Sequence, residues 1–376
     1  IRFQGFSEDW EQRKLGDVIE IESGMDYKSL NPGDIPVYGT GGYMLSVDKA
    51  LSYERDAIGI GRKGTIDKPY ILKAPFWTVD TLFYCIPKEN YSLNFVHCIF
   101  QKINWKKKDE STGVPSLSKT IIKNIPEYFP SLSEQKKLGK FFSSLDDTIT
   151  LHQRKLESMK LLKKSLLQKM FPKSGETVPE VRFPGFADAW EQRKLGDLAD
   201  IVGGGTPSTS KSEYWNGDID WYAPAEIADQ IYVSSSQKKI TQAGYDNSSA
   251  KMLPVGTVLF TSRAGIGKTA ILAQKGCTNQ GFQSIVPHEG QLDSYFIFSR
   301  TDELKKYGET TGAGSTFVEV SGKQMARMEL LMPPTWSEQQ EIGRPFASVD
   351  STITLHQRKV EALQKLKKSL LQQMFV

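Results

Sequence analysis

The segment from Ser262 to Thr269 has residue types that could hold a nucleotide. In a phosphate-binding loop, backbone N–H groups of a glycine-rich turn cradle the phosphates, and a following Lys and Ser or Thr bind phosphate and Mg²⁺. Gly267, Lys268 and Thr269 have these types in this order, but Ser262 stands where the first glycine belongs. An NTP-binding enzyme built on Gly267-Lys268-Thr269 is therefore one alternative function.

A second glycine pattern, Gly59, Gly61 and Gly64, matches the G-x-G-x-x-G fingerprint of dinucleotide-binding proteins. That fingerprint needs a helix whose N-terminus holds the pyrophosphate. Here Asp67, Pro69 and more strand-like sequence follow, so we expect no nucleotide at this position.

Other catalytic constellations are not visible. No Ser-His-Asp or paired-carboxylate arrangement can be proposed from spacing, and the four histidines, His97, His152, His288 and His356, offer no pair of metal ligands. We therefore expect a protein that is not an enzyme, with no metal and no cofactor of its own.

The cysteines and the hydropathy pattern indicate a compartment. Cys85, Cys98 and Cys277 show no paired spacing, and no run of about 18 apolar residues could cross a bilayer. We expect a cytoplasmic protein without a membrane. Because the sequence opens at Ile1, we also expect that a few N-terminal residues are missing from it.

Two long amphipathic segments dominate the chain. Residues Ser131 to Phe171 return as Thr335 to Phe375, with 25 of 41 positions identical. Each copy starts with a capping box after a proline and carries apolar residues at steps of three and four, which is typical of one face of a helix. We expect the two helices to pair antiparallel through these residues: Leu145, Ile149, His152, Leu156, Met159, Val349, Ile353, His356, Val360 and Leu363.

Two further points concern these helices. The alternative to a pair is that each helix packs only on its own globular body.

Pro345 stands where the first copy has Phe141, and because proline lacks an N–H we expect the second helix to kink there. Residues 162 and 366, both Leu, continue the apolar face in each copy.

The globular regions also repeat. Arg2, Phe3, Gly5, Phe6 and Trp10 to Asp17 return 180 residues later, with twelve of sixteen positions identical. Short β-branched and aromatic runs between glycines and prolines then predict strands, and one helix is expected in each body, Leu93 to Trp105 and Leu292 to Tyr307. The second body is 24 residues longer.

The resulting fold class is α+β, with two similar mixed domains joined by two long antiparallel helices in a pseudo-two-fold dumbbell. The expected boundaries are a first domain over 1–130, a long spacer helix over 131–171, a linker over 172–180, a second domain over 181–334 and a second spacer helix over 335–376.

The charge distribution favours local contacts over a global field. The net charge is +4, and because the two helical segments together carry +7, the rest of the chain carries −3. A nucleic-acid surface on the bodies would thus be a local patch, whereas the helix charges are equally explained as a solvated face.

Glycine-punctuated loops of both bodies offer donors, acceptors and cations suited to DNA bases and phosphates. In the first body these candidates are Lys28, Tyr38, Thr40, Tyr43, Arg62, Lys63 and Trp77, and in the second they are Thr206, Ser208, Lys211, Tyr222, Arg263, Lys268, Asn279 and Gln280. Aromatic residues in such loops also serve local packing, so individual contacts are hypotheses.

The arrangement resembles the specificity subunit of type I restriction-modification enzymes over essentially the whole chain. Its most specific marks are Trp10 to Asp17 with Trp190 to Asp197, Pro130 with Ser133-Glu134-Gln135, and Pro334 with Ser337-Glu338-Gln339. By this resemblance the bodies are target recognition domains, each reading one half of a split, asymmetric target in double-stranded DNA, and the helices space them.

The resemblance also implies partners. The helices would dock two methylation subunits, which carry S-adenosylmethionine and methylate adenine, and restriction subunits would use ATP and Mg. The sequence-specific DNA-binding chain would direct both activities and catalyse neither. Besides the NTP-binding enzyme, the alternative that stays open is a helical scaffold that does not bind DNA.

Overall fold

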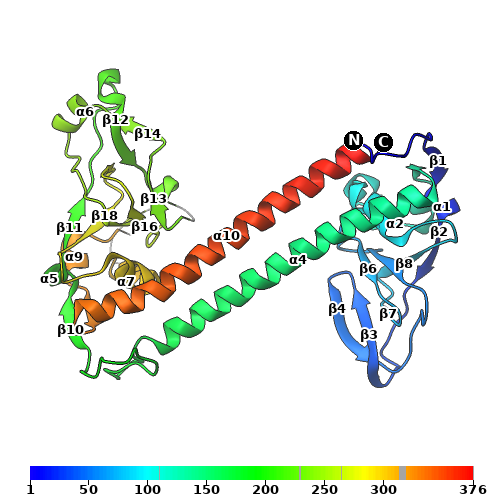
Figure 1. The fold of residues 1–376 in the computed structure, drawn as a ribbon, viewed down its shortest axis with the longest axis horizontal. Coiled ribbons are helices and arrows are strands. Elements are labelled where there is room, and N and C mark those ends of the chain that lie inside the picture. Colours follow the sequence, from blue (N-terminus) through cyan, green and yellow to red (C-terminus); the bar gives the residue numbers. More distant parts are fainter. Residues whose placement is uncertain (110, 228–229, 264, 313–318, 376) are drawn as a thin grey trace. The chain divides into compact units, whose positions relative to one another are not determined.

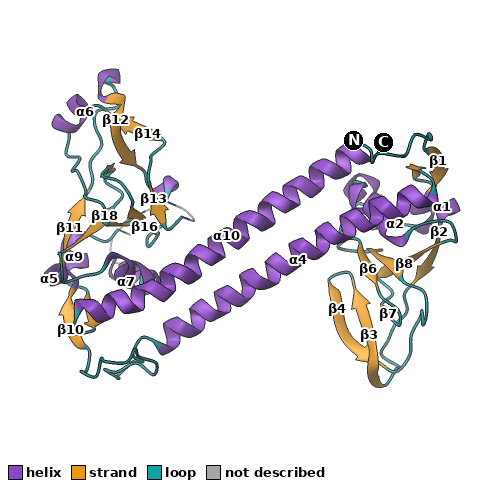
Figure 2. Ribbon diagram, in the orientation of Figure 1, coloured by secondary structure: helices purple, strands orange, loops and turns teal. Residues whose placement is uncertain are grey.

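A computed structural model describes residues 1–109, 111–227, 230–263, 265–312 and 319–375. Two compact units divide the chain: unit 1 comprises Ile1–Arg154 and His356–Val376, and unit 2 comprises Lys155–Leu355. The two long helices, α4 (Leu132–Lys169) and α10 (Trp336–Met374), each contribute one part to unit 1 and the other part to unit 2 (Figures 1 and 2).

Unit 1 contains three sheets and several short helices. In chain order its elements before α4 are β1 (Glu11–Lys14), α1 (Leu15–Val18), β2 (Ile19–Ser23), β3 (Pro32–Gly39), β4 (Gly42–Val47), β5 (Ala57–Gly61), β6 (Tyr70–Leu72), β7 (Trp77–Thr78), β8 (Leu82–Pro87), α2 (Leu93–Lys102), η1 (Trp105–Lys108), α3 (Lys119–Lys123) and β9 (Pro126–Phe129). The sheet orders are β2-β8-β5-β6, β4-β3-β7 and β1-β9.

Unit 2 repeats this plan with additions. Its elements between the long helices are β10 (Glu191–Lys194), α5 (Leu195–Leu198), β11 (Ala199–Gly203), η2 (Ser212–Tyr214), β12 (Trp215–Tyr222), η3 (Pro224–Glu226), β13 (Tyr232–Val233), β14 (Lys238–Ile240), α6 (Gln242–Asp246), β15 (Val258–Phe260), β16 (Thr269–Leu272), β17 (Cys277–Thr278), β18 (Gln283–Pro287), α7 (Ser294–Ser299), α8 (Thr301–Gly312), α9 (Gly322–Ala326) and β19 (Glu329–Met332). The sheet orders are β11-β18-β15-β16-β13, β14-β12-β17 and β10-β19.

The two units share one topology. In each, the central strand of the three-stranded sheet pairs in parallel with a two-residue strand, Val37 with Trp77 in unit 1 and Trp221 with Cys277 in unit 2. The extra residues of unit 2 include β13, which adds a fifth strand beside β16, and α6. The mixed fold predicted from the repeats is confirmed.

Most predicted elements form at the expected places, with two differences at helix ends. The helix expected over Leu93 to Trp105 ends at Lys102, and Trp105 starts η1. The single helix expected over Leu292 to Tyr307 is wrong, because α7 ends at Ser299 and α8 begins at Thr301. The break is stabilised by Thr301, whose hydroxyl donates to the carbonyl of Phe298 at 2.6 Å.

Each unit has a core built from its body and from both long helices. In unit 1, Leu138 and Phe142 of α4 and Leu371 and Met374 of α10 join one buried cluster with the body. In unit 2, Ile342 and Phe346 of α10 do the same, and Leu166 and Leu167 of α4 pack against that cluster. The alternative in which each helix packs only on its own body is therefore wrong within both units.

The long helices begin where the sequence predicts, at Leu132 and Trp336. The Thr335 hydroxyl accepts from the Glu338 backbone N at 3.3 Å, which is one half of the expected capping box. The other half is absent, because the Glu338 carboxylate binds an arginine instead. Helix α10 continues through Pro345 to Met374.

Candidate nucleic-acid interface

A bidentate ion pair joins the front of each body to the start of its long helix. Arg2 donates from Nε and Nη2 to both carboxylate oxygens of Glu134 at 2.7 Å, and Arg182 binds Glu338 in the same way at 2.7 and 2.8 Å. Both glutamates are only 1% exposed. These hydrogen bonds raise the pKa of each arginine and fix the body against the helix.

The glutamine that follows each of these glutamates makes a second connection. Gln135 accepts from the backbone N of Ser92 at 3.1 Å, and Gln339 accepts from that of Asp293 at 2.9 Å. The Ser-Glu-Gln motif therefore positions the body, and the bodies in turn carry the loops that could reach DNA.

In unit 1, the hairpin between β3 and β4 presents the first group of candidates. Thr40 lies in its turn, and Tyr43 is 63% exposed, with its hydroxyl 3.2 Å from that of Ser46. Tyr38 is half-buried and its ring contacts the rings of Tyr43 and Tyr70 edge-on or tilted. Lys28, in the loop before β3, is exposed.

The loop after β5 fixes the backbone of Arg62 and Lys63 and exposes both side chains. Their backbone N atoms donate to the carbonyl of Thr81 at 2.8 and 3.3 Å, and the Arg62 carbonyl accepts from Leu117 N at 2.9 Å. The Arg62 guanidinium lies 5.9 Å from the centre of the Phe83 ring. This arrangement suits a cation that contacts phosphate or a guanine edge.

In unit 2, two loops are linked by a hydrogen bond from the Thr206 hydroxyl to the Gln280 side chain. Asn279 uses its side-chain oxygen to accept from Gly281 N at 2.8 Å, which leaves the amide group as donor. Ser208 and Lys211 are exposed. The Tyr214 hydroxyl accepts from Lys211 and raises its pKa, so Lys211 is a cation at neutral pH.

The loop between β15 and β16 holds Arg263 and Lys268. Arg263 is half-buried and forms an isolated bridge with Glu319, whereas the Lys268 side chain is exposed. Residue 264 lies outside the described residues. The Arg263 side chain is thus less exposed to solvent than the Arg62 side chain.

This loop contradicts the NTP-binding alternative. A phosphate-binding loop ends in a helix, but Thr269 begins strand β16, and its hydroxyl lies 2.6 Å from that of Thr301. A Cβ on Gly267 would lie 2.3 Å from Lys305 Cγ, so the turn is filled by the protein itself. The expected absence of a helix after Gly59, Gly61 and Gly64 also holds, because β6 is the next regular element.

Two aromatic candidates need correction. Trp77 is 7% exposed and donates from Nε1 to the Met25 carbonyl at 2.9 Å, and Tyr222 is 1% exposed at the end of β12. Both lie in the strand pair that forms the core of the three-stranded sheet. Because both side chains are buried there, neither is placed as an exposed contact for a base.

Sequence reasoning missed three exposed side chains of apolar or aromatic type on unit 1. Met25, Met44 and Tyr53 are each about half exposed or more, at 56%, 48% and 62%. Met44 directly follows Tyr43 in the hairpin, which makes it available for contact with a thymine methyl group. The sequence signal that could have identified the hairpin residue is a pair of glycines followed by aromatic and apolar residues in a short hairpin.

The predicted helix-pair residues are all buried or half-buried. In unit 1, His152 and His356 place their Nδ1 atoms 2.9 Å apart, and Lys367 binds Asp146 at 2.5 Å. In unit 2, Lys163 binds Asp350 at 2.7 Å. Within each unit, the paired segments of α4 and α10 run antiparallel. Leu162 and Leu366 of the expected apolar face are exposed, whereas Met170 and Met374 farther along it are buried.

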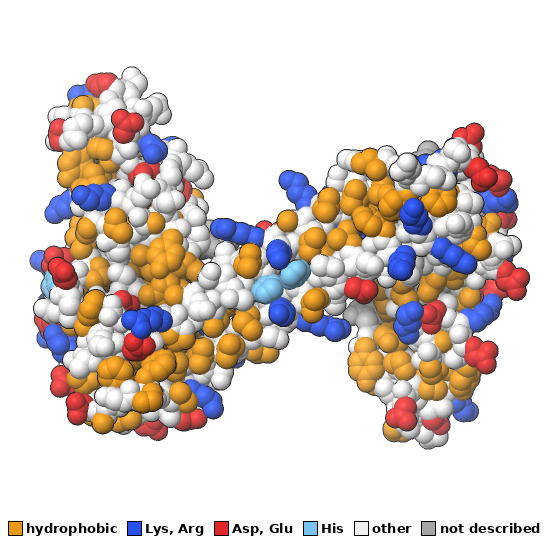
Figure 3. Space-filling view, viewed as in Figure 1, with side chains coloured by type: hydrophobic (Ala, Val, Ile, Leu, Met, Phe, Trp, Pro, Cys, Tyr) orange, Lys and Arg blue, Asp and Glu red, His pale blue; other side chains and the backbone are white. Residues whose placement is uncertain are grey.

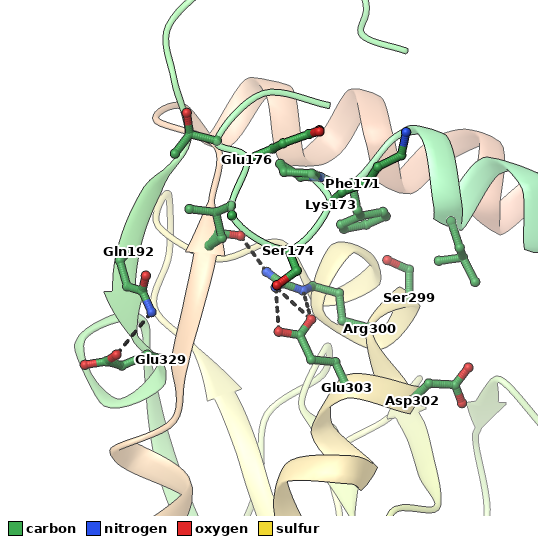
Figure 4. A pocket seen from close by; sticks show the side chains of 15 residues that line it. Phe171, Lys173, Ser174, Glu176, Gln192, Ser299, Arg300, Asp302, Glu303 and Glu329 are labelled. Carbon is green, nitrogen blue, oxygen red and sulfur yellow. Dashed lines mark hydrogen bonds and ion pairs between the residues drawn. The ribbon is translucent and has the colours of Figure 1, made fainter. Parts of the chain in front are cut away.

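A pocket of about 670 Å³ lies in unit 2 between the segment after α4 and the start of α8 (Figure 4). Its most buried cation, Arg300, is held by Glu303 at 2.7 Å and donates to the Leu331 carbonyl at 2.8 Å. Because its guanidinium is already paired with Glu303, Arg300 does not offer this pocket an unpaired cation for a ligand.

Charges and metal ligands complete the description. In the face shown in Figure 3, basic and acidic side chains are interspersed over both bodies. Among the described residues, no group of three or more His, Cys, Asp or Glu side chains could hold a metal ion, and no helix is both long and apolar enough to span a membrane.

Comparison with known proteins gives consistent matches. The family model described as "Type I restriction modification DNA specificity domain" matches residues 7–161 and 187–365. The MjaIX specificity subunit of Methanocaldococcus jannaschii is 35% identical over 190 residues, which are 50% of this chain and 44% of that protein. The chain thus spans less than half the length of this relative.

Two further matches cover nearly the whole chain. A protein of M. jannaschii named as a putative type I restriction enzyme MjaX specificity subunit is 23% identical, over 97% of this chain and 92% of its own length. The crystal structure of a type I S subunit from M. genitalium superposes with a TM-score of 0.74 at 12% identity, covering 100% and 98% of the two chains. The last match shows the shared fold.

Proposed function

Because the chain belongs to the family of type I restriction modification DNA specificity domains, we propose that it is the sequence-specific DNA-binding subunit of such a system. In this role it selects the target and directs adenine methylation and restriction by partner subunits. The chain itself is the non-catalytic component, and the relatives that it matches are named as specificity subunits.

The target is split and asymmetric. One observation carries this proposal: the two units share a topology and the same arginine-glutamate pair, but their outer loops differ. Unit 1 presents a hairpin with Thr40 and Tyr43, whereas unit 2 presents the linked Thr206 and Gln280. Equivalent frames that carry different donors and acceptors suit two different half-sites.

The partners follow from the same assignment. Two methylation subunits supply S-adenosylmethionine and the methyl transfer, and restriction subunits supply ATP- and Mg-dependent cleavage. The chain's own contribution is to bind duplex DNA through exposed cations such as Arg62, Lys63 and Lys268, and to hold the partners in place.

The test is to map adenine methylation across the genome in otherwise identical cells with and without this chain. We expect one bipartite motif to be methylated only when the chain is present. A binding assay with a duplex that contains this motif then separates the proposal from a helical scaffold, which would show no binding preference for the motif. An unchanged methylation map would contradict the proposed function.

A further inference from the structure

Strand β6 is the last strand of its sheet in unit 1, whereas the matching sheet of unit 2 continues with one more strand. Among the described residues, β6 has β5 as its only neighbouring strand. Its counterpart β16 pairs with β15 on one side and with β13 on the other (Figure 1). The outer edge of a strand presents backbone N–H and C=O groups that can pair with a further strand.

The two edge strands correspond residue by residue. Ile71 of β6 pairs with Ile58 of β5, and Ile271 of β16 pairs with Val258 of β15. Each residue of the second pair stands 200 positions after its counterpart in the first pair. Ile271 is 2% exposed, whereas Ile71 is half-buried. The outer side of β6 is therefore less covered than that of β16.

In unit 2, β13 covers this side through backbone hydrogen bonds. The backbone N of Ile271 donates to the carbonyl of Ile231 at 2.7 Å, and that of Ala273 donates to the carbonyl of Val233 at 2.9 Å. Ile231 also packs against the core of unit 2, and Val233 is 1% exposed. Unit 2 thus shows which kind of segment fits such an edge: a parallel strand with a β-branched residue on either side of Tyr232.

Aromatic side chains of unit 2 pack between this edge and the long helix. Measured between ring centres, Tyr232 lies 6.3 Å from Tyr295, and Tyr295 lies 5.4 Å from Phe298. The Tyr295 hydroxyl donates to the Asp350 carboxylate of α10 at 2.9 Å. A tyrosine hydroxyl and a carboxylate therefore pair at this place.

Unit 1 has no aromatic residue of α2 at the corresponding positions. The backbone N atoms of Ser92 and Asp293 donate to equivalent glutamines, so α2 and α7 correspond with an offset of 201 positions. Asn94 and His97 stand where unit 2 has the two aromatic residues of α7. The carboxylate is retained, because Asp146 of α4 stands where α10 has its aspartate.

A hollow of about 360 Å³ lies at this place in unit 1. The edge of β6 forms one part of its lining, and α2 and α4 form the others. The residues that matter for a ligand are Tyr70 and Ile71 of β6, Asn94 and His97 of α2, and Asp146 and Asp147 of α4. The strand edge and the hollow are thus parts of one surface.

The charges of the hollow indicate what it can bind. Two carboxylates, Asp146 and Asp147, line it, and no Lys or Arg is among the described residues of the lining. Asp146 already binds Lys367 at 2.5 Å, whereas Asp147 is exposed. Such a lining repels the phosphates of DNA but suits a hydroxyl donor of the kind that Tyr295 supplies in unit 2.

We propose that the outer edge of β6 binds one extended segment of a partner protein. The segment pairs in parallel with β6, as β13 pairs with β16, and carries a tyrosine between two β-branched residues. The tyrosine ring enters the hollow, where its hydroxyl donates to Asp146 or Asp147. One segment binds per chain, because β13 already covers the edge in unit 2. The inference goes beyond the proposed function and does not depend on it.

The probe is a fluorescently labelled peptide with the sequence of residues 230–236, Gln-Ile-Tyr-Val-Ser-Ser-Ser, mixed with the whole chain. We expect saturable binding in fluorescence anisotropy. Hydrogen–deuterium exchange should slow at the amides of Ile71 and Lys73, the counterparts of Ile271 and Ala273. A peptide with alanine in place of its tyrosine should bind at least about tenfold more weakly, because the ring supplies the contacts with the hollow.

Two changes of the chain close the site in different ways. Asn94→Tyr with His97→Phe places the aromatic residues of unit 2 in the hollow, and Ile71→Pro removes the outward backbone donor, a change that edge strands tolerate. We expect both variants to lose peptide binding, with circular dichroism and DNA binding unchanged. The matched control is Ile71→Val, which keeps the backbone N–H and a β-branched side chain and should bind the peptide as the wild type does.

Absence of saturable peptide binding to the wild-type chain would overturn the proposal. Equal binding to the wild type and to the folded Asn94→Tyr, His97→Phe double variant would overturn it as well. Slowed exchange at β16 instead of β6 would also contradict it, because the peptide would then have replaced β13. These outcomes leave the proposed function standing, since methylation mapping tests DNA recognition separately.

Discussion

At the scale of the residue, Arg62 and Arg263 occupy corresponding loops but differ in exposure. We predict that Arg62→Ala and Arg263→Ala each weaken binding to target DNA. A phosphate contact lowers the slope of log affinity against log salt by about one, whereas a base contact costs about 1 to 3 kcal/mol and relaxes one position of the motif.

The control for this pair is Arg55→Ala, because Arg55 is 60% exposed and already binds Glu20. We expect its DNA affinity to match that of the wild type. If Arg62→Ala folds normally and binds with unchanged affinity and salt dependence, Arg62 has a structural role only.

The buried ion pair of unit 2 leads to a stability prediction. Arg182→Ala leaves the Glu338 carboxylate, 1% exposed, without its main partner, and removal of one member of a buried pair costs about 3 kcal/mol. The midpoint of the urea unfolding transition of unit 2 should therefore move to a lower urea concentration. Arg344→Ala, which breaks an exposed pair with Glu341, should cost less than about 0.5 kcal/mol, and equal losses would contradict this ranking.

Residue types in the sequence predicted which loops could contact DNA, but they did not predict which side chains are exposed. Arg62 and Lys63 are exposed as expected, whereas Trp77 and Tyr222 are buried. The difference arises from parallel pairing between strands about 40 to 60 residues apart, which no local pattern reveals. The glutamate of each capping box likewise took a distant arginine as its partner.

At the scale of the element, close approach of α4 to α2 gives a test of packing. A Cβ on Gly139 would lie 2.8 Å from Phe95 N, whereas one on Gly343 would lie 3.1 Å from the Asp293 side chain. We predict that Gly139→Ala lowers the free energy of unfolding of unit 1 by about 1 to 3 kcal/mol, because backbone cannot yield to the added methyl group.

The matched substitution is Gly343→Ala. Its neighbour is a side-chain oxygen, and alanine favours a helix over glycine by about 0.5 to 1 kcal/mol, so we expect a change smaller than that of Gly139→Ala. Thermal or urea unfolding monitored by circular dichroism distinguishes the two. Equal destabilisation would show that the two helix contacts are equivalent.

The long helices were the elements that sequence predicted best. Their starts at Leu132 and Trp336 follow from local capping and period. The break between α7 and α8 was missed because the hydroxyl of Thr301 stabilises it, and threonine is compatible with a continuing helix. The alternation of short strands predicted their existence but not their order.

At the scale of the whole molecule, the helices are proposed to set the distance between half-sites. Inserting four residues after Gln153 and after Gln357 adds about 6 Å to each helix and keeps the apolar face approximately in register. At about 3.4 Å per base pair, we predict a spacer longer by about one or two base pairs and unchanged half-sites.

Methylation mapping checks this prediction, and an insertion in one helix alone serves as the control, which should lose activity through mismatched packing. An active double-insertion variant that methylates the original spacer would show that other features set the distance.

The central claim is that each body reads its own half-site independently. The most direct measurement exchanges residues 18–130 for the corresponding body of another specificity subunit and keeps Trp10 to Asp17 and both long helices. Genome-wide methylation mapping should then show one new half-site, with the other half-site and the spacer unchanged. A motif altered in both halves, or in neither, would contradict the account.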